Sequence, residues 1–117
     1  LGTRVELRSP DCATNPYLAI AVCLAAGLDG IKNNLQPVDS IQRDIYSMTD
    51  EERDEAGIEN LPKNLYEAIQ EMRKSDFVKG VLGKEVFKKY IKAKEEEWME
   101  YTSQVTDWEI DRHLGRI

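Results

Sequence analysis

Three charged residues alternate with two apolar residues near the start of the sequence, in the order Arg4, Val5, Glu6, Leu7, Arg8. Successive side chains of an extended chain point to opposite faces, so the charged residues share one face and the apolar residues share the other. A carboxylate between two guanidinium groups suits a site for a divalent cation and for phosphate or carboxylate groups. The alternative interpretation is an ordinary ladder of surface ion pairs. In either case the pattern predicts a β-strand over residues 3–8.

A strongly apolar helix is expected directly after this strand. Asn15 can cap a helix through its side chain, and Pro16 fits the first helical position. Apolar residues then continue around nearly the whole circumference of residues 16–32. Such a helix is typically buried on several sides. We therefore expect either later helices to cover it or its exposed part to promote self-association.

The rest of the sequence predicts further helices. Threonine or asparagine stands three residues before a glutamate at Thr49, Asn64 and Thr106, a spacing typical of helix starts. Gly57 and Gly83 are placed to end helices. The expected helices cover residues 50–56, 65–74, 76–82, 84–105 and 107–114. The predicted fold is mainly α, with one N-terminal β-strand followed by a helical bundle, in a single domain of residues 1–117.

Composition narrows the classes of function. The 117 residues are 41% hydrophobic, which is enough for a core, and carry a net charge of −6, which disfavours direct binding to nucleic acid. The longest apolar run, residues 17–26, is shorter than the roughly 20 residues of a membrane span. We therefore expect a cytoplasmic protein with no membrane partner. Cys12 and Cys23 lack the spacing of a metal site, and we expect both thiols to be free.

Over essentially its whole length, the sequence resembles type I glutamine synthetase. The segments that carry the likeness are RVELRSPD (4–11), ATNPYLA (13–19), AAGLDGIKN (25–33), IYSMTDEE (45–52), GIENLP (57–62), AKEEEW (93–98) and VTDWE (105–109). The first three are the most specific, because they join unusual residues at fixed offsets. Cys12 stands where the family often has proline and Thr14 where it often has alanine, and neither departure affects a charged position.

The resemblance implies a larger enzyme. Residues 1–117 would be the C-terminal portion of an α+β catalytic domain, and the start at Leu1 without a methionine fits an excised fragment. The implied reaction joins ammonia to the side chain of glutamate at the expense of ATP, through γ-glutamyl phosphate. The complete enzyme would be a dodecamer that uses Mg²⁺ or Mn²⁺, whereas we expect the fragment alone to be inactive.

The resemblance also implies roles for the charged residues. Arg4 would bind the phosphate groups of ATP, and Glu6 would be a metal ligand. Arg8 would be the catalytic residue that binds the glutamate substrate and its phosphorylated intermediate. These roles agree with the chemistry of the side chains, because guanidinium groups pair with oxyanions and carboxylate oxygens suit hard divalent ions.

Two further residues receive a structural interpretation. Tyr46 occupies the position that some bacterial glutamine synthetases modify with an adenylyl group, but the closing segment is more similar to the feedback-regulated Gram-positive subtype, which is not controlled in this way. We therefore interpret Tyr46 as a loop tyrosine. The single histidine, His113, is expected to be exposed or to cap a helix. The rival hypothesis for the whole chain is an independent helical module for protein interaction or regulation.

Overall fold

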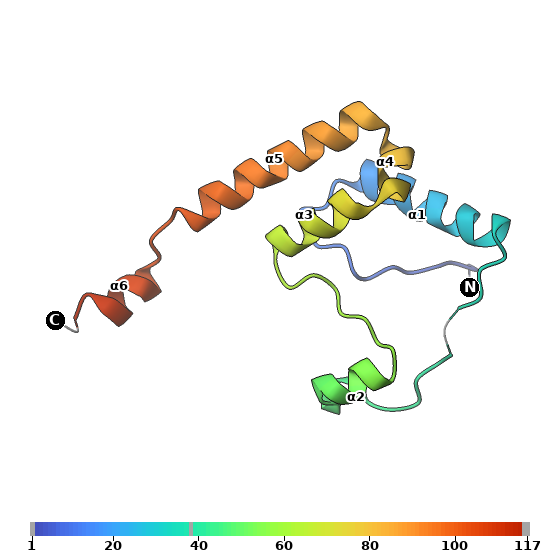
Figure 1. Cartoon of the computed structure of the whole chain (residues 1–117), viewed down its shortest axis with the longest axis horizontal. Helices are drawn as coiled ribbons and strands as arrows, with labels where there is room; N and C mark the ends of the chain where they lie inside the picture. Colours follow the sequence, from blue (N-terminus) through green and yellow to red (C-terminus); the bar gives the residue numbers. More distant parts are fainter. Residues whose placement is uncertain (1, 38, 116–117) are drawn as a thin grey trace. The chain divides into compact units, whose positions relative to one another are not determined.

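The computed structural model describes residues 2–37 and 39–115, and these residues are mainly α-helical (Figure 1). The described elements are α1 (Pro16–Lys32), the 3₁₀ helix η1 (Ile45–Ser47), α2 (Asp50–Glu55), α3 (Leu65–Lys74), α4 (Asp76–Leu82), α5 (Lys84–Thr102) and α6 (Asp107–His113). Helix α5 ends three residues before the expected limit at Val105. No helix among the described residues is long and apolar enough to cross a membrane.

The predicted N-terminal β-strand was wrong. Residues 2–9 form no strand, and Figure 1 draws them as a plain trace. A strand exists only where a neighbouring strand pairs with its backbone, and the described residues provide no such neighbour for this segment. Alternation of side chains sets which residues share a face, but it does not supply a hydrogen-bonding partner.

The helix starts follow the expected capping chemistry. The Asn15 side chain accepts hydrogen bonds from the backbone N–H groups of Tyr17 and Leu18, and Pro16 takes the first helical position. Thr49 and Thr106 each form a reciprocal capping box with the glutamate three residues later. The predicted caps are therefore confirmed, which is consistent with their being local interactions encoded by neighbouring residues.

Gly83 separates α4 from α5 through an unusual backbone conformation. Its φ of 74° and ψ of 153° lie in a region that is essentially restricted to glycine. The same residue is the C-cap of α4 and the N-cap of α5. One glycine thus ends the first helix and lets the second begin at the next residue.

The chain divides into two compact units, Leu1–Asn60 with Gly80–Leu82 and Leu61–Lys79 with Gly83–Ile117. We call them unit 1 and unit 2. The described residues contain three buried hydrophobic side chains, Met48 in unit 1 and Ile69 and Ile91 in unit 2. Each unit therefore has a very small core for its length.

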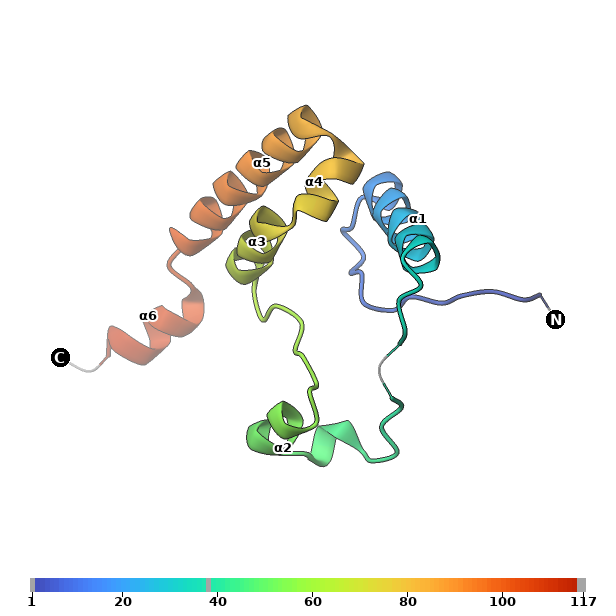
Figure 2. The same ribbon diagram turned by 45° about the vertical axis from the view of Figure 1, so that its right-hand side comes forward.

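Unit 2 is organised around packing of α3 against α5, which lie side by side in Figure 2. Ile69 on α3 and Ile91 on α5 are its buried residues. Arg73 donates to the Glu95 carboxylate from one helix to the other. At the far end of α5, the ring of Trp98 lies 6.2 Å from that of Tyr66. These contacts place aliphatic, ionic and aromatic interactions along one helix pair.

Unit 1 contains the apolar helix α1, which is much more exposed than its sequence suggested. No residue of α1 is buried. Leu18, Val22 and Ala25 are half-buried, whereas Ile20, Leu24 and Leu28 are exposed. The structure therefore agrees with the exposure of α1 in the second expected outcome, while the self-association that this outcome also included stays a prediction.

Candidate functional site

The three charged residues predicted from the sequence lie together. Arg4 donates from Nε to Oε1 of Glu6 at 2.6 Å, and Arg8 donates from Nη2 to Oε2 of Glu6 at 3.0 Å. We call Arg4, Glu6 and Arg8 the charged triad. All three side chains are exposed to solvent. The extended backbone of residues 4–8 accounts for this arrangement, because it directs alternate side chains to the same side.

Electrostatics within the charged triad favour the ionised carboxylate. The hydrogen bond from Arg4, and then that from Arg8, holds the pKa of Glu6 below its ordinary value. Two guanidinium groups beside one carboxylate also leave a net positive charge. The triad can therefore attract an anion such as a phosphate or a carboxylate.

The fit of the triad to a divalent cation is incomplete. Each oxygen of Glu6 already accepts a hydrogen bond from an arginine. No group of three or more histidine, cysteine, aspartate or glutamate residues is placed to hold a metal ion within residues 2–37 and 39–115. Mg²⁺ prefers six oxygen ligands in octahedral geometry, so Glu6 offers one ligand of a site whose others these residues do not provide.

The opposite face of the N-terminal segment is apolar, and its residues Val5 and Leu7 stay largely exposed. Val5 and Leu7 line an open groove of about 630 Å³ within unit 1. The remaining lining residues are Pro10, Ala19, Ile20, Cys23, Leu24, Gly27, Leu28 and Ile31. We call this feature the apolar groove. The predicted separation of charged and apolar faces is therefore present even though the strand is not.

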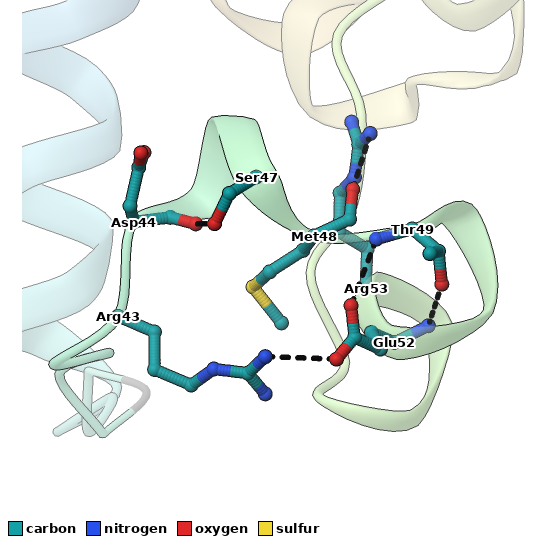
Figure 3. Close-up of polar contacts among 7 residues, drawn as sticks. All are labelled: Arg43, Asp44, Ser47, Met48, Thr49, Glu52 and Arg53. Atoms are coloured by element: carbon teal, nitrogen blue, oxygen red, sulfur yellow. Dashed lines mark hydrogen bonds and ion pairs between the residues drawn. The ribbon is translucent and has the colours of Figure 1, made fainter.

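A second polar cluster surrounds Met48 in unit 1 (Figure 3). Arg43 donates to Oε1 of Glu52 at 2.8 Å, and Arg53 donates to the backbone carbonyl of Met48 at 3.0 Å. The backbone N–H of Thr49 donates to the other oxygen of Glu52 at 2.9 Å. The Arg43 hydrogen bond is the largest cause of the lowered pKa of Glu52. This cluster links the loop that carries Arg43 and Met48 to α2.

The sequence signalled only part of this second cluster. The Thr49 and Glu52 spacing indicated the cap, but the ion pair from Arg43 spans nine positions and depends on the path of the loop. The other residues considered for function stand apart from the charged triad. Tyr46 is 98% exposed on η1, and the ring of His113 meets that of Trp108 edge-on at 6.2 Å.

Both cysteines are free, as expected, and both are exposed, although Cys23 lies on the helix that was expected to be buried on several sides. Cys23 lies on α1 and lines the apolar groove, whereas Cys12 is not among the groove residues. The thiol of Cys23 is left exposed because no described residue covers this face of α1.

Comparison with known proteins agrees with the resemblance found in the sequence. The family model described as glutamine synthetase, catalytic domain, matches residues 1–113. A glutamine synthetase of Clostridium saccharobutylicum is 50% identical over 115 residues, which are 98% of this chain and 26% of that protein. One of Methanosarcina mazei is 52% identical over 116 residues, or 99% of this chain and 26% of that protein. One of Thermotoga maritima is 47% identical over 113 residues, or 97% of this chain and 26% of that protein. The chain thus spans about a quarter of the length of these curated relatives, and the matched part is their C-terminal part.

Proposed function

Because the chain belongs to the glutamine synthetase family, we propose that it is the C-terminal portion of the catalytic domain of an ATP-dependent glutamate–ammonia ligase. The complete enzyme would form glutamine from glutamate and ammonia through γ-glutamyl phosphate. The observation that carries the proposal is the family match over residues 1–113, which includes the charged triad.

The proposed chemistry is mainly the handling of negative charge. Both ATP and glutamate are anionic, and the phosphoryl group in transfer spreads charge over its oxygens, so catalysis depends on positioning and on positive groups. We assign Arg4 to the phosphate groups of ATP and Arg8 to the substrate carboxylate and the phosphorylated intermediate. The net positive charge of the triad supports this assignment. Each arginine contacts Glu6 through one nitrogen, and a guanidinium carries five N–H donors, so other N–H groups of Arg4 and Arg8 can bind an anion while the contact with Glu6 is kept.

Glu6 is proposed as one ligand of a divalent cation, Mg²⁺ or Mn²⁺, in the complete enzyme. Such an ion would neutralise charge on the nucleotide. The remaining ligands would come from parts of the enzyme outside this chain, because the described residues hold no second acidic cluster suited to a metal. We further propose that the complete enzyme is a dodecamer and acts in the cytoplasm, as the family resemblance implies.

The test uses the chain within a complete enzyme. We define the restored protein as the Clostridium saccharobutylicum glutamine synthetase with its matched region replaced by residues 1–117. Glu6→Gln in the restored protein is expected to lower ATP-dependent glutamine formation by about 100-fold or more, since such electrostatic groups commonly contribute this much. Glu71→Gln is the matched control, because Glu71 is also an exposed, ion-paired carboxylate, 2.7 Å from Nζ of Lys74.

Two results would contradict the proposal. If Glu6→Gln left turnover unchanged, the assignment of Glu6 to the site would be wrong. If the restored protein folded with the native oligomeric state but formed no glutamine, the chain would not supply the function of the region that it replaces. The rival hypothesis of an independent helical module predicts this second result, a restored protein without glutamine formation.

A further inference from the structure

The charges of helix α5 are separated along its length. Residues 84–94 carry five lysines and one glutamate, whereas residues 95–102 carry four glutamates and no lysine or arginine. The opposite order would stabilise the helix, because the N-terminal end of a helix is partially positive and its C-terminal end partially negative. The N-cap residue, Gly83, forms no side-chain hydrogen bond that would offset this effect. The charge order of α5 is therefore unfavourable for the helix by itself.

Ion pairs within α5 do not explain this order. Nζ of Lys92 lies 3.6 Å from Oε1 of Glu96, and Nζ of Lys94 lies 2.6 Å from Oε2 of Glu97. The pair of Lys92 with Glu96 places the lysine before the glutamate, and at this spacing the reverse order stabilises a helix better. A helix that needed only internal ion pairs would thus gain more from the reverse arrangement.

The side of α5 that is turned away from α3 carries both signs of charge. Figure 2 shows α3 alongside α5, and Ile91 is the buried residue of α5. Helical periodicity places Lys89, Glu96 and Glu100 on the opposite side, and all three are exposed. Lys88 and Lys89 form no ion pair with any residue in the part of the chain that the structure describes, and the same holds for Glu100. We define the outer face of α5 as Lys88, Lys89, Lys92, Ala93, Glu96 and Glu100.

A second copy of α5 in the opposite direction has the complementary order of charges. The lysine half of each helix then lies along the glutamate half of the other. With the centre of the pair near residues 94 and 95, Lys89 is level with Glu100 of the second copy. Lys92 is then close to the level of Glu96, and two-fold symmetry forms each of these contacts twice. Ala93 lies near the centre and is exposed, and its small side chain lets the two helices approach closely.

We propose that α5 pairs in antiparallel orientation with α5 of a second copy of this chain, through the outer face. The proposal goes beyond the proposed function and does not depend on it, because it uses charges of unit 2 alone. Exposed ion pairs contribute little singly, so the association is weak and sensitive to salt. A long polyanion is a poorer partner for the lysines, because the chain as a whole carries a net charge of −6 and repels it.

Sedimentation equilibrium of the 117-residue chain is the first test. The dissociation constant of the dimer should rise about tenfold or more between about 0.05 and 0.5 M NaCl, because salt screens the attraction between opposite charges. Association through the exposed apolar residues of α1 would not weaken in salt, and repulsion between two negative chains would be relieved by it. A dissociation constant that stays constant or falls as salt is added, or a chain that stays monomeric, would overturn the pairing.

Charge reversal on the outer face is a sharper test. Lys88→Glu with Lys89→Glu, and separately Glu96→Lys with Glu100→Lys, should each weaken self-association about tenfold or more at low salt. An equal mixture of the two double variants should associate as tightly as the parent chain, because every opposed pair again has opposite charges. A mixture that associates no better than either variant alone would contradict the proposal.

A matched control separates pairing from net charge. Asp54→Lys with Glu55→Lys changes two exposed carboxylates of α2 and alters the net charge as much as Glu96→Lys with Glu100→Lys does. Both double variants reduce the net negative charge, so net charge alone would strengthen association in both. The proposal predicts weaker association only for the change on α5. Circular dichroism should show that this variant keeps its helix content, because lysine near the C-terminal end agrees with the helix dipole.

Crosslinking tests the orientation of the two helices. In a chain with Cys12→Ser and Cys23→Ser, Ala93→Cys should be linked to its copy by a short bismaleimide reagent, because residue 93 lies near the centre of the pair. Glu85→Cys should not be linked, because the two copies of residue 85 would lie about 30 Å apart along the pair, at a rise of about 1.5 Å per residue. Equal linking of both variants, or of neither, would overturn the antiparallel arrangement.

Discussion

At the scale of single residues, ion pairs near the surface set the electrostatic character of unit 1. Glu6 lies between Arg4 and Arg8, and Glu52 lies between Arg43 and the backbone N–H of Thr49. Both carboxylates have a lowered pKa, with an arginine as the largest cause. An ion pair between arginine and glutamate is therefore found in two settings. At Glu6 it belongs to the candidate binding site, and at Glu52 it closes a loop.

Glu52 gives a prediction about pH. Its folded pKa is lowered from an ordinary value of 4.5, so its contribution to stability is present above that value and is lost as the pH falls through the folded pKa. An NMR titration of the side-chain carboxyl is the measurement. Arg43→Ala should move the pKa of Glu52 upward, whereas Arg73→Ala, which removes an ion pair of unit 2, should not. An unchanged pKa in the Arg43→Ala variant would show that the ion pair does not form in solution.

The sequence identified the members of the charged triad because alternation along an extended segment is a local property. It did not identify the ion pair of Arg43 with Glu52, since that contact depends on the path of the loop between α1 and α2. The chemical roles of Arg4, Glu6 and Arg8 stay predictions, because they depend on ligands and residues outside this chain. Local geometry was thus accessible from sequence, and contacts across a loop were not.

At the scale of elements, helix starts were predictable and burial was not. Asn15, Thr49 and Thr106 cap their helices as expected, because the donors and acceptors lie within three residues. The strand at residues 3–8 and the burial of α1 failed for a shared reason. Both require neighbouring segments. An apolar or alternating pattern shows that a segment could pack or pair, but it does not show whether a neighbour is present.

Two glycines in or beside α4 should respond in opposite directions to alanine. Gly83→Ala is expected to cost about 1–3 kcal/mol, because its backbone conformation is restricted to glycine. Gly80→Ala should stabilise by about 0.5–1 kcal/mol, because Gly80 lies within the helix. A Cβ at either position meets no atom within 4 Å, so the two changes differ in backbone conformation alone. Free energies of unfolding from urea titration measure both, and a Gly83→Ala variant as stable as the parent would refute this account.

The packing of α3 against α5 gives a second prediction for elements. Ile91→Ala should cost about 2 kcal/mol, the low end for such truncations, because the core around Ile91 is small and can relax. Met99→Ala on the same helix should change stability by less than about 0.5 kcal/mol, because Met99 is exposed. Thermal unfolding followed by circular dichroism compares the two. Equal effects would mean that the helices do not pack through Ile91.

At the scale of the whole molecule, the part of the chain that the structure describes assembles no metal site. The charged triad offers a single carboxylate. We therefore expect no ATP-dependent glutamine formation by the isolated 117-residue chain. The assay should include the restored protein as the positive control, and turnover by the isolated chain at a comparable rate would show that its own residues suffice.

The packing of the aromatic residues in unit 2 affects the fluorescence of its tryptophans. Trp98 is half-buried, with the rings of Tyr66 and Tyr101 at 6.2 and 5.9 Å, whereas Trp108 is 67% exposed. These are the only two tryptophans in the sequence. Trp98 should emit at a shorter wavelength than Trp108, and separation of α3 from α5 should shift only the Trp98 component towards the red. Intrinsic fluorescence can thus follow the opening of this helix pair without an added dye.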